Sequence, residues 1–179
     1  VEMFTEARHP FYESTSFLSL REIPADIYRA FIIERLASYG KEISDEAIDI
    51  ILDWTRRHTF YTQKLCHILF NIQHDYYDRN DAVFAINRIL DEYEDRFFEI
   101  RNLITPAQWN FLRAVAKEGG TDHPMAKDFL EKYKIGTPAN AKRCLASLLE
   151  KELILASPHK DGITYTVYNV FLSRWFESH

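Results

Sequence analysis

The sequence predicts a mainly α-helical protein in two parts: a four-helix bundle, then a second domain of four helices and a small β-hairpin. Apolar residues recur every three to four positions over residues 24–150, a period typical of helices. The period changes to two between Leu153 and Val167, as in strands. Charge also divides the chain, because residues 103–179 hold 10 of the 22 Lys and Arg but only 8 of the 27 Asp and Glu.

The overall composition is that of a folded protein with a large core, since 46% of the 179 residues are hydrophobic and 15% are aromatic. A net charge of −5 argues against attraction of the whole chain to nucleic acid or membranes. Cys66 and Cys144 lack partners at zinc-ligand spacing, which favours buried free thiols. Without a signal peptide or long apolar run, we expect a soluble, cytoplasmic protein with no membrane partner. Because Val1 begins in mid-pattern, we also expect a fragment of a longer chain.

Residues 1–23 are predicted to be an irregular linker, and residues 24–103 to form the bundle. The first helix starts around Pro24 and ends at Gly40, and Ser44 caps the second. The third follows Thr59, and the fourth starts near Asn80. The residues expected to face the core are Tyr28, Phe31, Ile32, Leu36 and Tyr39, then Ile48, Ile51, Leu52 and Thr55, then Tyr61, Leu65, Ile68, Leu69 and Ile72, and finally Val83, Ile86, Leu90, Tyr93, Phe97 and Ile100.

Residues 104–179 are predicted to form the second domain. Thr105 and Gln108 make a capping box around Pro106, and Gly119-Gly120 ends that helix. A short helix follows, and a further one starts at Thr137-Pro138.

Strands are then expected over 153–157 and 163–167, joined by a tight turn at 160–162, with a closing helix over 170–177. This order of helices and hairpin is that of a winged helix-turn-helix.

The sequence predicts no catalytic residues and no metal site. No segment matches G-x-x-x-x-G-K-[ST], and Gly40-Lys41 lacks the rest of that phosphate-binding pattern. Strands do not alternate with helices, so no parallel sheet is expected to hold a nucleotide. We therefore expect no enzyme activity and no cofactor in the chain itself.

Two polar clusters stand out, at residues 8–12 and at residues 55–63. In the second, the free N–H groups that open the third helix can receive an anion close to Arg56 and Arg57. The alternative is structural: Arg56 and Arg57 cap the second helix, and Thr59 caps the third.

Residues 55–63 resemble a lid motif, T-x-G-H-P-Y-Y-x-Q, of archaeal-type P-loop ATPases of the STAND/AAA+ group. The similarity extends to an N-terminal M-F-x-x-A-x-x-P-F-Y pattern, to the L-T-P-A-Q stretch that opens the winged helix, here with Ile104 first, and to the ending over 168–175. The residues that match the two longer motifs are Thr55, His58, Phe60, Tyr61 and Gln63, and Met3, Phe4, Ala7, Pro10, Phe11 and Tyr12.

The resemblance implies a helical lid and a winged helix that follow a missing N-terminal ATPase core. That core would bind ATP and Mg²⁺, and the lid would place Arg57, His58, Thr59 and Tyr61 on the nucleotide side. The chain departs from the motif at Arg57, where the family has Gly, and at Thr59, where it has Pro. The implied role is to couple the nucleotide state of the core to a macromolecular partner.

Two other functions remain open from the sequence. One is DNA binding through the second domain, where the candidate contacts are Asn140, Lys142, Arg143, Ser147, His159 and Lys160. The other is a stand-alone helical adaptor that binds proteins.

Overall fold

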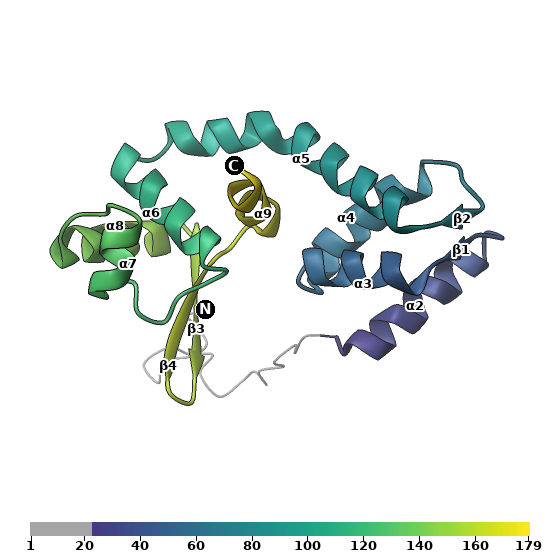
Figure 1. Ribbon diagram of the computed structural model, residues 1–179, viewed down its shortest axis with the longest axis horizontal. Coiled ribbons are helices and arrows are strands. Elements are labelled where there is room, and N and C mark those ends of the chain that lie inside the picture. Colours follow the sequence, from purple (N-terminus) through teal and green to yellow (C-terminus); the bar gives the residue numbers. More distant parts are fainter. Residues whose placement is uncertain (1–22) are drawn as a thin grey trace, which may run out of the picture.

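The computed structural model describes residues 23–179, which form two lobes joined by one long helix and by the C-terminal helix (Figure 1). The helical lobe comprises α2 (Ala25–Ala37), α3 (Asp45–Trp54), α4 (Thr59–Phe70) and most of α5 (Arg79–Asn102), with the short strands β1 (Glu42–Ile43) and β2 (Tyr76–Tyr77). The winged-helix lobe comprises α6 (Pro106–Lys117), α7 (Lys127–Lys132), α8 (Pro138–Glu150), β3 (Ile154–His159), β4 (Gly162–Val167) and α9 (Val170–Ser178). The predicted fold class is therefore confirmed. The predicted division at residues 103 and 104 stays a prediction.

The core of the helical lobe follows the predicted faces of α3 and α4 closely. The four residues predicted to face inward on the second helix are all buried. For the first helix the prediction was partly wrong. Phe31 of α2 is 54% exposed, and Tyr39, which follows the end of α2, is 58% exposed. This helix lies at the edge of the lobe, where only the narrow stripe of Tyr28, Ile32 and Leu36 is covered.

The long helix α5 buries a different stripe from the one predicted in its first half. Ala82, Ala85 and Ile89 are fully buried, whereas Val83 is 40% exposed. Small side chains allow α3 and α4 to approach α5 closely, so the alanines carry the contact that we had assigned to larger residues. The helix begins at Arg79, beside a capping box formed by Asp78 and Asp81.

A pair of two-residue parallel strands closes the helical lobe and was not predicted. Glu42 lies opposite Tyr76, and Ile43 opposite Tyr77. Tyr77 is fully buried, and its hydroxyl donates to the Phe70 carbonyl at 3.2 Å. Such short strands leave no periodic pattern in a sequence, because one alternation cannot be distinguished from a loop.

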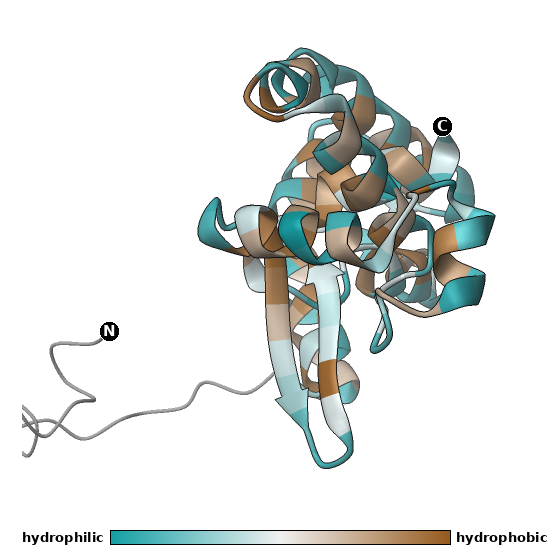
Figure 2. Ribbon diagram, turned by 90° about the vertical axis from the view of Figure 1, so that its left-hand side faces the viewer, coloured by the Kyte–Doolittle hydropathy of each residue, from teal (hydrophilic) through white to brown (hydrophobic). Residues whose placement is uncertain are grey.

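The winged-helix lobe has the predicted caps and hairpin. The Thr105 and Gln108 side chains form the capping box of α6, and Thr137 caps α8. Strands β3 and β4 are antiparallel and extend from the helices to a hydrophilic tip (Figure 2). Thr121 pairs with Tyr165 and brings the chain close to β4. At this approach Gly120 has a φ of 126°, and a Cβ there would lie 2.8 Å from Thr166 Cγ2.

Replacing Thr105 by alanine should lower the free energy of unfolding by about 1 kcal/mol, because the Gln108 N–H loses its acceptor at the start of α6. Urea denaturation followed by circular dichroism measures the change. The control is Ser157→Ala, an exposed wing substitution expected to stay within about 0.5 kcal/mol of the unsubstituted protein. Equal losses for both variants would contradict the cap.

Candidate functional site

The turn between α3 and α4 lies within the polar cluster of residues 55–63, and its backbone conformation is unusual. Arg56 and Arg57 both lie in the left-handed region, with φ of 51° and 55°. Their N–H groups bond to the carbonyls of Asp53 and Leu52 and so end α3. Arg57, at the position where the lid motif that this segment resembles has glycine, thus adopts a conformation that glycine adopts without strain.

Two buried threonines fix this turn from the inside. The hydroxyl oxygens of Thr55 and Thr62 lie 2.8 Å apart. Each also lies within hydrogen-bonding distance of a carbonyl, that of Ile51 at 2.7 Å and that of His58 at 3.1 Å. Since buried polar groups are costly when unpaired, this network ties the end of α3 to the first turn of α4.

The structural alternative for this cluster is only partly right. The backbone of Arg56 and Arg57 does cap α3, but Thr59 does not cap α4. The N-cap residue is His58, whose side chain makes no capping hydrogen bond. Thr59 is the first helical residue instead, so its hydroxyl is in the wrong position to accept from the free N–H groups.

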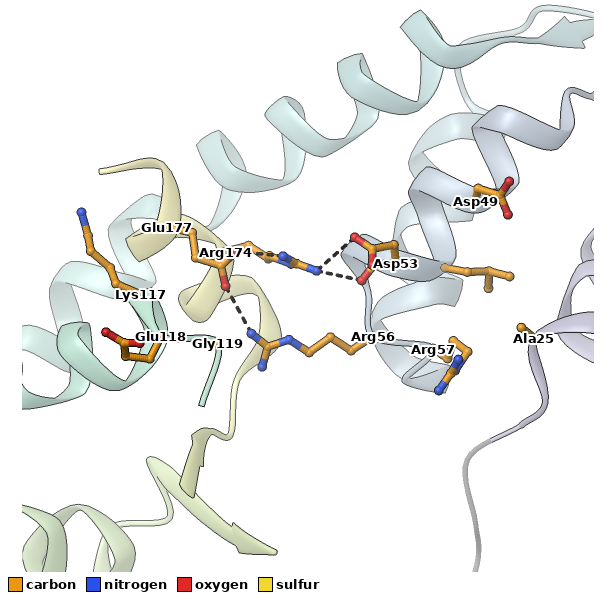
Figure 3. Close-up of a pocket in the computed structure, with 11 residues that line it drawn as sticks. Ala25, Asp49, Asp53, Arg56, Arg57, Lys117, Glu118, Gly119, Arg174 and Glu177 are labelled. Carbon is orange, nitrogen blue, oxygen red and sulfur yellow. Dashed lines mark hydrogen bonds and ion pairs between the residues drawn. The ribbon is translucent and has the colours of Figure 1, made fainter. Parts of the chain in front are cut away.

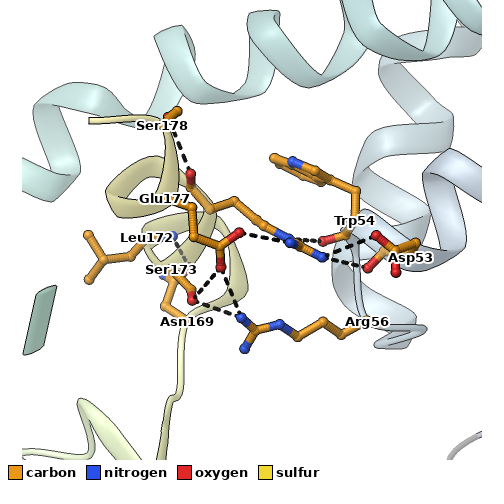
Figure 4. A network of polar contacts seen from close by, with 9 residues as sticks. Asp53, Trp54, Arg56, Asn169, Leu172, Ser173, Glu177 and Ser178 are labelled. Atoms are coloured by element: carbon orange, nitrogen blue, oxygen red, sulfur yellow. Dashed lines mark hydrogen bonds and ion pairs between the residues drawn. The ribbon is translucent and has the colours of Figure 1, made fainter. Parts of the chain in front are cut away.

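The Arg56 side chain leaves the turn and contacts α9, across 117 residues of sequence (Figure 4). Its Nη2 donates to Ser173 Oγ at 2.9 Å and to Glu177 Oε1 at 3.2 Å. In the opposite direction, Arg174 of α9 donates to the main-chain oxygens of Trp54 at 2.9 Å and Asp53 at 2.7 Å. Arg174 also pairs with Glu177 at 2.8 Å. Burial, followed by repulsion from Arg174, lowers the pKa of Arg56, and Glu177 opposes that shift.

An aromatic cluster lies beneath these charges. Phe171 of α9 is fully buried, with its ring centre 5.5 Å from that of Trp54, 4.6 Å from Tyr61 and 5.2 Å from Tyr93. All three pairings join α9 to helices of the helical lobe. The pairs with Tyr61 and Tyr93 are edge-to-face, and such packing adds to the stabilisation from burial of apolar area. We call the contacts of Arg56, Phe171, Ser173, Arg174 and Glu177 the α9 contact.

The residues that the resemblance places on the nucleotide side are separated by this packing. Arg57, His58 and Thr59 are exposed on the outside of the turn. Tyr61 points the other way: it is 93% buried against Phe171, and burial raises the pKa of its hydroxyl. His58 stays close to it, with ring centres 4.7 Å apart. The structure therefore brings three of the four together at one surface and leaves Tyr61 beneath it.

A cavity of about 770 Å³ lies beside the turn, between the two lobes (Figure 3). Its basic side chains come from Arg56, Arg57, Lys117 and Arg174, and its acidic ones from Asp49, Asp53, Glu118 and Glu177. The balance of four against four gives the cavity no preference for an anion. Within residues 23–179, no group of three or more His, Cys, Asp or Glu is arranged to hold a metal ion.

The DNA-binding candidates on α8 fall into two groups, exposed side chains and side chains with hydrogen bonds inside the lobe. Lys142 and Arg143 are exposed. The Asn140 side chain instead donates to the Ile135 carbonyl at 3.0 Å, and the Ser147 hydroxyl accepts from Gln108 at 2.9 Å. These two polar side chains hold the lobe together.

At the hairpin tip, His159 and Lys160 are exposed. His159 Nε2 lies 3.6 Å from an Asp122 carboxylate oxygen, so this candidate contact has an acidic neighbour. Lys160 lies in the turn between the two strands.

The sequence interpretation missed Ser173, Arg174 and Glu177. Their spacing of three and four residues on one helix was visible and is typical of side chains that share a face. No local pattern, however, identifies a partner more than 100 residues away. The predictions for residues 1–22, including the linker and the cluster at 8–12, lie outside the described residues.

Comparison with known protein families supports a winged-helix fold for the second lobe. Residues 95–178 match a family described as a probable winged helix domain. This match begins in the last third of α5 and includes α9. The residues that form the α9 contact from the C-terminal side thus lie within the region that matches this family.

Neither the curated proteins nor the solved structures contain a match to this chain. In the described residues, no helix is long and apolar enough to span a membrane.

Replacing Phe171 by alanine should lower the free energy of unfolding by about 3–5 kcal/mol, because a fully buried ring leaves a cavity among three aromatic side chains. Chemical denaturation measures the loss. Leu155→Ala is the control, since Leu155 is 47% exposed on the wing and should lose far less. A Phe171→Ala variant as stable as Leu155→Ala would show that the ring is not packed as described.

Proposed function

We propose that this chain is the C-terminal regulatory region of a larger P-loop ATPase. The helical lobe is the lid over a nucleotide bound by the missing N-terminal core, and the winged-helix lobe passes the nucleotide state to a macromolecular partner. ATP and Mg²⁺ belong to the core, since no phosphate-binding loop occurs in these residues.

One observation carries the proposal: the turn that matches the lid motif is the place where α9 of the winged-helix lobe binds. Arg57, His58 and Thr59 are exposed on the outer side of that turn, while Arg56 and Tyr61 contact α9 on the inner side. A ligand that shifts the outer side must therefore disturb contacts to the winged helix. A local binding event is transmitted in this way when packed helices can adopt two alternative arrangements.

The full-length protein is expected to carry a G-x-x-x-x-G-K-[ST] segment before Val1 and to bind MgATP, whereas residues 1–179 alone should give no binding heat. Isothermal titration calorimetry of both proteins makes the comparison. His58→Ala in the full-length protein should weaken MgATP binding, with the exposed α5 substitution Asn87→Ala as control. Micromolar binding by residues 1–179 alone, or a full-length protein without the phosphate loop, would rule the proposal out.

DNA is the second candidate for the partner of the winged helix. Lys142 and Arg143 project from α8 between Ala139 and Ala146, which are also exposed and too small to block a close approach. In winged helix-turn-helix proteins this helix enters the major groove, and basic side chains there contact phosphates or base edges. Lys160 at the wing tip adds a further cation.

The double variant Lys142→Ala, Arg143→Ala should lose binding to mixed-sequence duplex DNA, and the slope of log affinity against log salt should fall by about 1 for each phosphate contact removed. Fluorescence anisotropy across a salt series measures both quantities. The matched control is Lys127→Ala, Arg88→Ala, which removes two exposed charges elsewhere. Absence of binding by the unsubstituted protein at low salt would exclude DNA as the partner.

A further inference from the structure

The polar groups that join the two lobes have a definite arrangement. Arg56 extends from the helical lobe to Ser173 and Glu177, and Arg174 extends from the winged-helix lobe to the carbonyl end of α3. The two arginines therefore extend in opposite directions and share Glu177 (Figure 3). Phe171, which lies on the same helix as Ser173, Arg174 and Glu177, is fully buried, so its aromatic contact excludes water.

Helix α9 has a second, independent attachment to its own lobe. Phe176 is almost fully buried, with its ring centre 4.6 Å from that of Trp109 in α6. The Asn169 side chain caps the helix by accepting from the Leu172 N–H, and Leu172 is fully buried. Separation from the α3–α4 turn would therefore leave α9 folded on the winged-helix lobe.

The surroundings of the contact leave room for such a separation. The cavity of about 770 Å³ lies directly beside Arg56 and Arg174, so the lobes are not closely packed there. Interfaces between domains that are small and partly polar usually permit relative motion. Charge pairs that are partly exposed are also weakened by salt.

We propose that α9 is a releasable latch that holds the winged-helix lobe against the α3–α4 turn and covers Trp54 and Tyr61 while it is bound. Release exposes the inner side of the turn without unfolding either lobe. The latch does not depend on the ATPase core, because all its contacts lie within residues 53–177.

In the bound and the released state of α9, the distance between the two lobes differs. Spin labels at Glu34→Cys on α2 and Glu150→Cys on α8 report the distance between the lobes by double electron–electron resonance. Both positions are exposed. The native thiols label poorly, because Cys144 is buried and burial raises the pKa of Cys66 to about 12. A labelling reaction on the protein without the two new cysteines measures any remaining background.

The double variant Arg56→Gln, Arg174→Gln should add a second distance population and raise the ratio of released to latched molecules by about tenfold or more, since four charge-assisted hydrogen bonds between the lobes are lost. Circular dichroism should stay unchanged. The control Arg88→Gln, Lys127→Gln removes one exposed charge from each lobe and should keep the single population. An unchanged distance distribution in the folded latch variant would overturn the proposal.

A measurement on the protein with Arg56 and Arg174 intact tests the same proposal if the double variant does not fold. Raising salt from about 0.05 M to about 1 M shortens the screening length to about 3 Å and should populate the released state. The expected result is a reversible growth of the second distance population. A distribution that does not change with salt would contradict a latch held by charged groups.

Discussion

The insertion of Phe171 between Trp54, Tyr61 and Tyr93 is the interaction on which the arrangement of the two lobes depends. A fully buried aromatic ring contributes a large apolar area, and three ring contacts fix its position. Because the ring sits on α9 and its neighbours on α3, α4 and α5, one side chain joins four helices.

Polar contacts of α9 also provide hydrogen-bond donors for carbonyl groups at the C-terminal end of α3. The last carbonyls of an α-helix have no partner within the helix. That of Trp54 accepts from Arg174, and that of Asp53 accepts from Arg174 as well as from the Arg56 N–H. A cation at this end also interacts favourably with the helix dipole. Arg56 does the reverse and brings a charge from the turn to α9. The two left-handed residues of the turn make this possible, because they direct the Arg56 side chain away from its own helix.

Features governed by neighbouring residues could be predicted from the sequence. The capping residues Ser44, Thr105 and Thr137, the stripe on α3 and the wing hairpin all follow from local rules and were confirmed. The stripe on α5 was misjudged because the closeness of α3 and α4 decides which side chains fit. The partners of Arg56 could not be predicted, since its hydrogen bond to Ser173 spans 117 residues. For the same reason the sequence did not indicate that Tyr61 would be buried beneath the winged-helix lobe.

A double-mutant cycle between Trp54 and Phe171 tests most directly whether α9 joins the two lobes. Trp54→Leu, Phe171→Leu and the double variant are compared with the unsubstituted protein by the free energy of unfolding. Because the two rings are in contact, the account predicts a coupling energy of at least about 0.5 kcal/mol. Single losses that add to within about 0.3 kcal/mol would show that the rings do not touch in solution and would contradict it.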